Sequence, residues 1–230
     1  AREWCQLIIG KGKTLEIDSL VLFKYLGSAH NLNGILWQKK GEYEQAIQHL
    51  LLSLDYFEST LDYKNVASVY TNISENFRFM KNFEKALEYN EKAEAIYRKE
   101  KLHHNLVTVF QNRGNIYNNQ EKHEEALILF KQTLVNAILY NDAENIVHAL
   151  NNLGVSYEEM GRHDQAIEYY FRALDIYKAR KNYWGEANTL GNISVIYLQR
   201  NDFEKAITFS KNSLAISQQN DFRELTLYNF

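Results

Sequence analysis

The sequence predicts an all-α fold, a right-handed α-solenoid of about five antiparallel helix pairs with partial helices at both ends. The first observation behind this prediction is a forty-residue period, because internal repeats of twenty to fifty residues are typical of stacked architectures. The second is composition. The 230 residues include no proline and ten glycines, which favours helices joined by short turns. The forty-residue step is kept by Ala46, Ala86, Ala126, Ala166 and Ala206.

Within one period, two amphipathic helices follow each other. In the clearest copy, apolar or small residues recur at three-to-four spacing over Leu150–Tyr157 and again from Ala166 onward. A small residue in each first helix would let the second helix approach closely, and an aromatic ring three positions later would fill the space between them. The small residues are Gly34, Ser74, Gly114, Gly154 and Ser194. The aromatic residues are Trp37, Phe77, Tyr117, Tyr157 and Tyr197.

The helices must end without proline. Asn and Asp suit turns and accept hydrogen bonds at helix starts, so we expect Asn82 and Asp202 to cap second helices. The expected turns are Leu61-Asp62, Asn141-Asp142, Lys181-Asn182 and Asn220-Asp221. At the start of the chain, residues 1–10 are interpreted as the second helix of a preceding, degenerate unit, and residues 17–40 as an unusually long first helix. A chain that begins at Ala1 and stops within an apparent helix is expected to be a piece of a longer protein.

The segment Leu150–Tyr157, with Ala166 and Tyr170 downstream, resembles the tetratricopeptide repeat, whose signature is Leu-Gly, then Tyr, then a later Ala and aromatic residue. The resemblance implies paired helices wound into a superhelix with a concave groove. Two features depart from the family pattern: the period is forty rather than about thirty-four, and the terminal proline is absent. The predicted divisions are 1–26 (a partial preceding repeat and the start of a long helix), five repeats at 27–66, 67–106, 107–146, 147–186 and 187–226, and 227–230 (the start of a further helix).

Four asparagines keep the same forty-residue step: Asn72, Asn112, Asn152 and Asn192. Each lies two positions before the small packing residue, about 200° away from it around the helix, so each should point away from the paired helix. In a fold of the resembled family, that direction is the concave groove. An amide offers a donor and an acceptor in one plane, which matches a peptide bond whatever side chain the peptide carries. We expect this asparagine ladder to hold an extended segment by its backbone. The same ladder arrangement is implied by similarity to the O-linked N-acetylglucosamine transferase superhelix.

Further residues of the first helices should share this surface. They are mostly neutral, so we expect no cluster of Lys and Arg for gripping a terminal carboxylate; the two candidate cations are Arg78 and Arg113. The other predicted binding residues are Asn115, Asn151, Glu75, Gln111, His148 and Asn188. The alternative interpretation is that the amides bond to neighbouring helices or water, as most side-chain amides do.

No catalytic or metal-binding constellation is found in the sequence. The Gly-Lys-Thr at residues 12–14 lacks the first glycine of a phosphate loop, because Leu7 stands there. His103 and His104 are expected in an inter-repeat turn, and His123 and His163 recur one repeat apart without a nearby carboxylate ligand. We therefore predict no enzyme activity, no cofactor and no metal.

Three functions remain open. The first is a module that binds a protein or peptide segment, as part of a larger signalling protein of bacterial type, in the cytoplasm or, if the parent is a membrane-bound sensor, in the periplasm. The second is an assembly scaffold that forms homo-oligomers through its ends or convex face. The third, a fragment of a response-regulator phosphatase, lacks room for the helical bundle that such an enzyme needs. A net charge of −3 without a basic stripe argues against nucleic acid, and no apolar run is long enough to span a bilayer.

Overall fold

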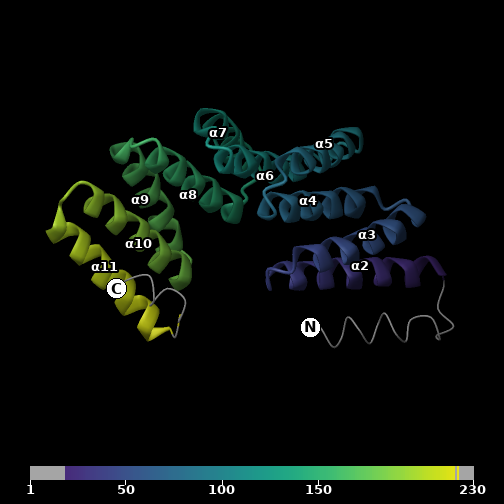
Figure 1. Cartoon of the computed structure of the whole chain (residues 1–230), viewed down its shortest axis with the longest axis horizontal. Coiled ribbons are helices and arrows are strands. Elements are labelled where there is room, and N and C mark those ends of the chain that lie inside the picture. Colours follow the sequence, from purple (N-terminus) through teal and green to yellow (C-terminus); the bar gives the residue numbers. More distant parts are fainter. Residues whose placement is uncertain (1–18, 221, 223–230) are drawn as a thin grey trace. The chain divides into compact units, whose positions relative to one another are not determined.

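The computed structural model describes residues 19–220 and Phe222. This part of the chain contains α-helices, one short 3₁₀ helix and no strand, so the predicted all-α class is confirmed (Figure 1). The helices are α2 (Ser19–Gln38), α3 (Tyr43–Ser59), α4 (Tyr63–Phe79), α5 (Phe83–Lys99), η2 (His103–Asn105), α6 (Leu106–Asn119), α7 (His123–Leu139), α8 (Ala143–Glu159), α9 (His163–Ala179), α10 (Tyr183–Gln199) and α11 (Phe203–Gln219).

The described residues divide into two compact units, one up to residue 120 and one from residue 121. In the first unit, α2 packs on α3 and α4 packs on α5, and α6 lies against both α4 and α5. In the second unit, α7 packs on α8, α8 on α9, α9 on α10 and α10 on α11. Even-numbered helices are the first helices of the repeats and odd-numbered helices are the second helices, as the sequence pattern predicted.

The forty-residue period arises from two halves of twenty residues. Most helices have 17 residues, and the three-residue turn that follows places its middle residue at positive φ. After α3, for example, Leu61 has a φ of 54°, and the Asp62 N–H donates to the carbonyl of Phe57 at 3.0 Å. This bond satisfies a carbonyl at the helix end, as glycine-ended helices do. The positive-φ residues are Gly41, Leu61, Lys81, Lys101, Glu121, Asn141, Gly161, Lys181 and Asn201.

The residue after each positive-φ position is the N-cap of the next helix. Asn82 accepts a hydrogen bond from the Lys85 N–H, and Asp202 accepts one from the Lys205 N–H, each at 3.2 Å. Both predicted caps are therefore confirmed. The predicted turns at Leu61-Asp62, Asn141-Asp142 and Lys181-Asn182 are confirmed too, and their polar members also cap the first helices that follow.

Two predictions concern the ends of the chain. α2 has 20 residues and is the longest described helix, as expected, but it ends at Gln38, two residues before the predicted end at residue 40. The predicted helix over residues 1–10, the Asp221 half of the predicted turn Asn220-Asp221 and the predicted helix start at 227–230 lie outside the described residues.

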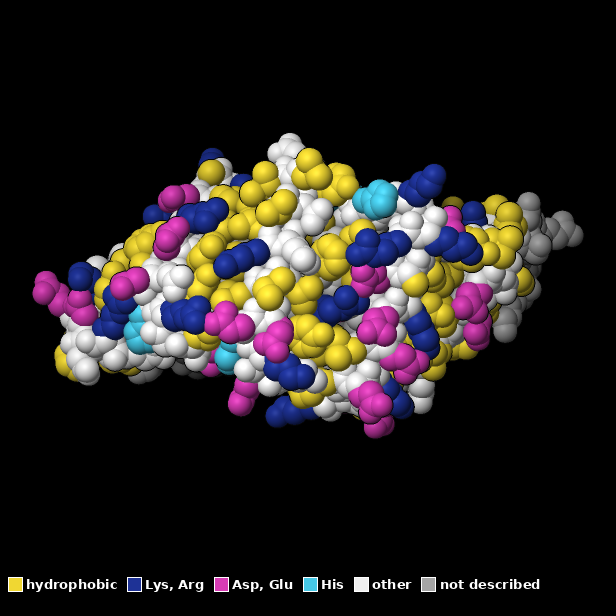
Figure 2. Space-filling view, turned by 90° about the horizontal axis from the view of Figure 1, so that it is seen from above, with side chains coloured by type: hydrophobic (Ala, Val, Ile, Leu, Met, Phe, Trp, Pro, Cys, Tyr) yellow, Lys and Arg dark blue, Asp and Glu magenta, His cyan; other side chains and the backbone are white. Residues whose placement is uncertain are grey.

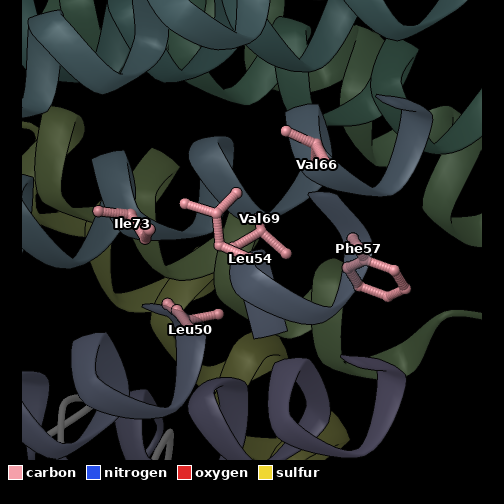
Figure 3. Packing of buried hydrophobic residues seen from close by; sticks show 6 residues of the cluster. All are labelled: Leu50, Leu54, Phe57, Val66, Val69 and Ile73. Carbon is pink, nitrogen blue, oxygen red and sulfur yellow. The ribbon is translucent and has the colours of Figure 1, made fainter. Parts of the chain in front are cut away.

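The recurring alanines are packing residues. Ala46, Ala86, Ala126 and Ala166 are fully buried. Larger apolar side chains from paired and successive helices pack together to form the core. In the first unit, α3 and α4 face each other through six buried side chains (Figure 3). They are Leu50, Leu54, Phe57, Val66, Val69 and Ile73.

The small residues sit where the paired helices come closest. A Cβ built on Gly154 would lie 2.5 Å from the ring of Tyr170, and one on Gly34 would lie 2.7 Å from Leu50 Cγ. These contacts confirm that small side chains permit the close approach. The rings three positions later also behave as predicted, because Tyr157 stacks on Tyr169 with ring centroids 5.4 Å apart. Equivalent stacking joins Phe77 to Tyr89 and Tyr197 to Phe209.

Candidate functional site

In the first unit, the ladder asparagines lie between successive first helices. Asn72 on α4 donates from Nδ2 to Asn31 Oδ1 on α2 at 2.9 Å. Asn112 on α6 donates from Nδ2 to the Thr71 carbonyl on α4 at 3.4 Å, a long bond. Both side chains are half-buried and turn away from the paired helix, as predicted. We call the surface formed by the exposed sides of the even-numbered helices in each unit the first-helix face.

In the second unit, the ladder reaches a tyrosine of the preceding second helix. Asn192 on α10 forms a hydrogen bond with the hydroxyl of Tyr170 on α9, and Asn152 is half-buried on α8. Asn151 has a more structural place than predicted. It donates from Nδ2 to the Tyr177 hydroxyl at 2.7 Å and accepts from the Thr189 hydroxyl at 3.4 Å, so it joins α8, α9 and α10.

Glu75 and Arg78 neutralise each other on α4. The Arg78 guanidinium donates from Nε to Glu75 at 2.9 Å. Its Nη1 donates to Asn119 Oδ1 on α6 at 3.2 Å. Arg78 also lies over the Phe79 ring, 4.2 Å from its centroid. The Arg78 guanidinium therefore makes three contacts inside the molecule.

The remaining predicted residues lie on the same faces but with different surroundings. Gln111 is half-buried, and its Oε1 is a buried acceptor with no hydrogen-bond partner in the described structure. Asn115 on α6 and Asn188 on α10 are half-buried. His148 is exposed on α8, with Nε2 3.8 Å from Glu144. The first unit therefore carries Asn72, Glu75, Gln111, Asn112 and Asn115, and the second carries His148, Asn151, Asn152, Asn188 and Asn192.

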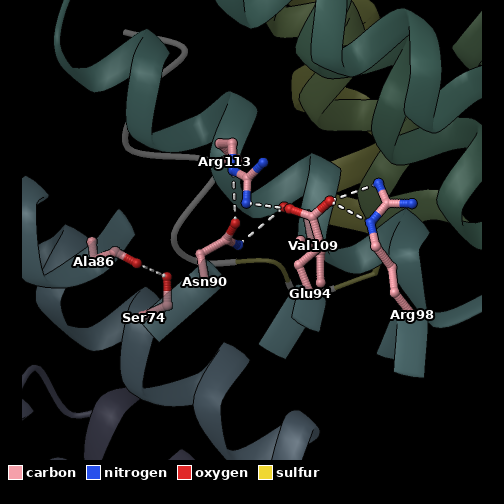
Figure 4. A network of polar contacts seen from close by, with 7 residues as sticks. All are labelled: Ser74, Ala86, Asn90, Glu94, Arg98, Val109 and Arg113. Carbon is pink, nitrogen blue, oxygen red and sulfur yellow. Dashed lines mark hydrogen bonds and ion pairs between the residues drawn. The ribbon is translucent and has the colours of Figure 1, made fainter. Parts of the chain in front are cut away.

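Arg113 belongs to a buried polar network that the sequence interpretation missed (Figure 4). Its Nε donates to Asn90 Oδ1 at 3.0 Å and its Nη2 donates to Glu94 at 2.6 Å, with both charged side chains 17% exposed. Burial opposes ionisation of Glu94, but the hydrogen bonds from Arg98 and Arg113 outweigh it and lower the pKa of this carboxyl. The network joins α5 to α6.

A signal for this network is present in the repeats. The position of Glu94 is a leucine in all four of the other repeats. The position of Arg113 is Ile or Leu in three of them. Two polar changes at facing core positions of one repeat junction predict an internal pair. The apolar counterparts are Leu54, Leu134, Leu174 and Leu214 for Glu94, and Ile73, Leu153 and Ile193 for Arg113.

A second missed group surrounds the end of α8. Glu158 is half-buried, and its Oε2 accepts a hydrogen bond from the Tyr170 hydroxyl at 2.8 Å. Burial is the main cause of the raised pKa of Glu158. Because Asn192 bonds the same hydroxyl, one carboxylate, one phenol and one ladder amide meet here.

The surface carries both signs of charge. On the face drawn in Figure 2, Lys and Arg side chains are intermixed with Asp and Glu, and hydrophobic side chains emerge between them. Within the described residues, no group of three or more His, Cys, Asp and Glu side chains is placed to hold a metal ion. No helix in residues 19–220 is both long and apolar enough to cross a membrane.

Two curated relatives are similar in sequence. Protein KINESIN LIGHT CHAIN-RELATED 2 of Arabidopsis thaliana is 26% identical over 202 residues, which cover 79% of this chain and 29% of that protein. Protein KINESIN LIGHT CHAIN-RELATED 3 of the same plant is 27% identical over 155 residues, covering 64% of this chain and 23% of the relative. The chain thus spans under a third of the length of these curated relatives.

Solved structures share the fold at lower identity. A Rap protein complexed with competence and sporulation factor superposes with a TM-score of 0.82 at 20% identity, covering 98% of this chain and 62% of that one. BtubC from P. vanneervenii superposes with a TM-score of 0.78 at 20% identity, covering 96% and 91%. These likenesses confirm the predicted solenoid of helix pairs.

The tetratricopeptide repeat model matches residues 25–99, 105–179 and 145–219, which together cover most of the chain. The repeat is generally a non-catalytic scaffold for protein–protein interaction, and the structure shows its paired helices, small packing residues and stacked rings. The chain belongs to the tetratricopeptide repeat family and is a protein-interaction module.

Proposed function

We propose that this module binds an extended protein or peptide segment along the first-helix face, with the ladder asparagines bonding the segment's backbone. The observation that carries the proposal is the position of the asparagines. Four repeats place Asn two residues before the small packing residue, and the side chains of Asn72, Asn112 and Asn192 reach other elements rather than their paired helix.

The intramolecular bonds of the ladder are compatible with a ligand. An asparagine amide has two N–H donors and a carbonyl with two lone pairs. The bond from Asn72 to Asn31 uses one donor, and it also holds the side chain in one orientation. A side chain that is already ordered loses little conformational entropy when a ligand arrives. The bonds therefore prepare the ladder for binding.

The neighbouring residues would select the sequence of the segment. In the first unit they are neutral or already paired, as Glu75 is with Arg78. In the second unit, by contrast, Glu158 is ionisable and lies beside the ladder. A similar Rap protein is complexed with competence and sporulation factor, and another is complexed with the Phr* peptide, which supports peptide binding by this fold. We place this non-catalytic module in the sensory or regulatory part of a larger signalling protein.

Peptides selected from a phage-displayed library of unstructured decamers test the proposal. We expect Asn72→Ala with Asn112→Ala to weaken the Kd of a selected peptide about 10- to 100-fold, because each lost hydrogen bond contributes about 1 kcal/mol. The melting temperature should fall by less than about 4 °C. Asn212→Ala, an exposed asparagine on the second helix α11, is the control and should leave the Kd unchanged. Full affinity in the double variant, or its unfolding, would show that the amides serve the fold alone.

One observation favours an assembly scaffold as a second function. The exposed side of α7 carries Ile128, Val135, Ile138 and Leu139, each more than half exposed. The corresponding residues of α5 are Glu88, Ala95, Arg98 and Lys99. The spacing of seven and three residues suits an antiparallel helix of a second copy, although one helix pair buries less than the roughly 1,200 Å² of a stable interface. Sedimentation at high concentration should show a weak dimer that Val135→Glu with Ile138→Glu abolishes. A chain that stays monomeric excludes this function.

A further inference from the structure

Glu158 is an acidic group whose local surroundings favour a positive partner. It lies in the last turn of α8 and is half-buried. No Lys, Arg or His forms an ion pair with it within the described residues, and the adjacent charge is that of Glu159, which has the same sign. A partly desolvated carboxylate without a cation costs free energy, and a ligand cation that pairs with it recovers part of that cost.

The hydrogen bonds of Tyr170 leave one acceptor unused on each of its two partners. The Tyr170 hydroxyl has a single proton, which it donates to Glu158 Oε2 at 2.8 Å. The bond between Tyr170 and Asn192 must therefore be donated by the Asn192 amide nitrogen. This order of donors leaves Glu158 Oε1 and the Asn192 carbonyl oxygen as acceptors that the Tyr170 hydroxyl does not use.

Tyr170 holds this arrangement rigidly. Its side chain is fully buried, and its ring lies against Gly154, where no Cβ fits. A phenol locked by close packing fixes the position of its oxygen, so the carboxylate and the amide are ordered before any ligand arrives.

The forty-residue comparison shows that the acidic group is local to one repeat. The residues that correspond to Glu158 are Gln38, Arg78, Asn118 and Leu198. Aliphatic side chains lie one turn from the polar pair: Val155 precedes Glu158 on α8, and Val195, which is 44% exposed, follows Asn192 on α10. Aliphatic neighbours beside two separate acceptors fit an aliphatic amine better than a planar guanidinium, which pairs most strongly with both oxygens of one carboxylate.

We propose that Glu158, Asn192 and Tyr170 form a subsite for a primary ammonium group of the bound segment, either a lysine side chain or a free N-terminus. The subsite rests on the proposed function, and it adds the chemical class of the group that selects the ligand. Glu158 Oε1 and the Asn192 carbonyl accept hydrogen bonds from the ammonium, while Tyr170 positions both.

The experiment uses small amines rather than a peptide, so that it can fail independently of the proposed function. The probes are Nα-acetyl-lysine N-methylamide for the side chain and alanine N-methylamide for the free N-terminus, with their fully acetylated forms as controls. The readouts are the carbon-13 shift of the Glu158 carboxyl and the side-chain amide signals of Asn192. We expect a saturable change with an ammonium probe, none with its acetylated form, and loss of the change in Glu158→Gln but not in Glu159→Gln.

The probe with the lower Kd identifies the source of the ammonium. Equal changes with the acetylated probes, or changes that persist in Glu158→Gln, would overturn the subsite. If the amines bind but the ladder substitutions leave peptide affinity intact, the proposed function fails while the subsite stands. If the ladder substitutions weaken peptide binding and the amines do not bind, the subsite fails while the proposed function stands.

Discussion

The carboxyl of Glu158 makes the stability of the protein depend on pH. Burial raises its pKa above the ordinary 4.5 in the folded chain, and the Tyr170 hydrogen bond opposes this shift only in part. The folded state therefore holds the proton more tightly than the unfolded state does. It follows that this residue's contribution to stability declines as pH rises from the ordinary value through the raised one.

Glu158→Gln tests this dependence, because glutamine cannot ionise yet still accepts the Tyr170 hydrogen bond. We expect the variant to match the wild type near pH 4 and to exceed it in free energy of unfolding at pH 7, measured by urea denaturation across that range. Glu159→Gln, at the exposed neighbouring position, should follow the wild type. A variant less stable than the wild type at pH 7 would show that the ionised carboxylate stabilises the fold.

Single residues also show how far the sequence could be interpreted. The direction of Asn72, Asn112 and Asn192 could be predicted, because helical periodicity alone sets the angle between two positions. Their partners could not, since the bond from Asn72 to Asn31 joins residues 41 positions apart and depends on how successive first helices pack. For the same reason, the hydrogen bond from Asn151 to Tyr177 could not be predicted, because Tyr177 lies on another helix.

At the scale of one helix junction, the Arg113–Glu94 pair replaces an apolar contact that other repeats make. Removing one member of a buried pair leaves the other charge without compensation, whereas removing both restores hydrophobic packing. We expect Arg113→Leu to lower the free energy of unfolding by about 3 kcal/mol, and Arg113→Leu with Glu94→Leu to return within about 1 kcal/mol of the wild type.

Chemical denaturation of the two variants checks this prediction. Arg162→Leu breaks the exposed pair with Glu124 on the surface of the second unit, and it should cost less than about 1 kcal/mol. If the double variant is as unstable as the single one, Arg113 and Glu94 are not energetically coupled. The network of Figure 4 then contributes no more to the free energy of unfolding than its residues do separately.

Helix boundaries were largely predictable because they depend on local chemistry. Asn and Asp at the turns cap the helices that follow, and the twenty-residue half-period reflects 17 helical residues and a three-residue turn. What could not be anticipated is that ordinary residues such as Leu61 and Lys81 occupy the positive-φ position, with glycine at only two of the described turns. Their conformation is imposed by the hydrogen bonds that close each helix end.

On the scale of the whole molecule, repetition makes the binding proposal specific. The axes of adjacent packed helices lie about 8–10 Å apart, and an extended chain rises about 3.4 Å per residue. Within the first unit, Asn72 on α4 and Asn112 on α6 would therefore meet peptide bonds about three residues apart. The ladder thus predicts a spacing in the ligand as well as an affinity.

The asparagines are proposed to bind backbone groups, so the most direct measurement changes the backbone of the ligand. Each peptide bond of a selected decamer is replaced in turn by an ester, which removes one N–H donor, and each Kd is measured by calorimetry against wild type and Asn112→Ala. If the ladder binds backbone groups, two or more bonds about three residues apart are ester-sensitive, and one of them loses its sensitivity in Asn112→Ala. Ester effects that are the same in both proteins at every position would contradict it.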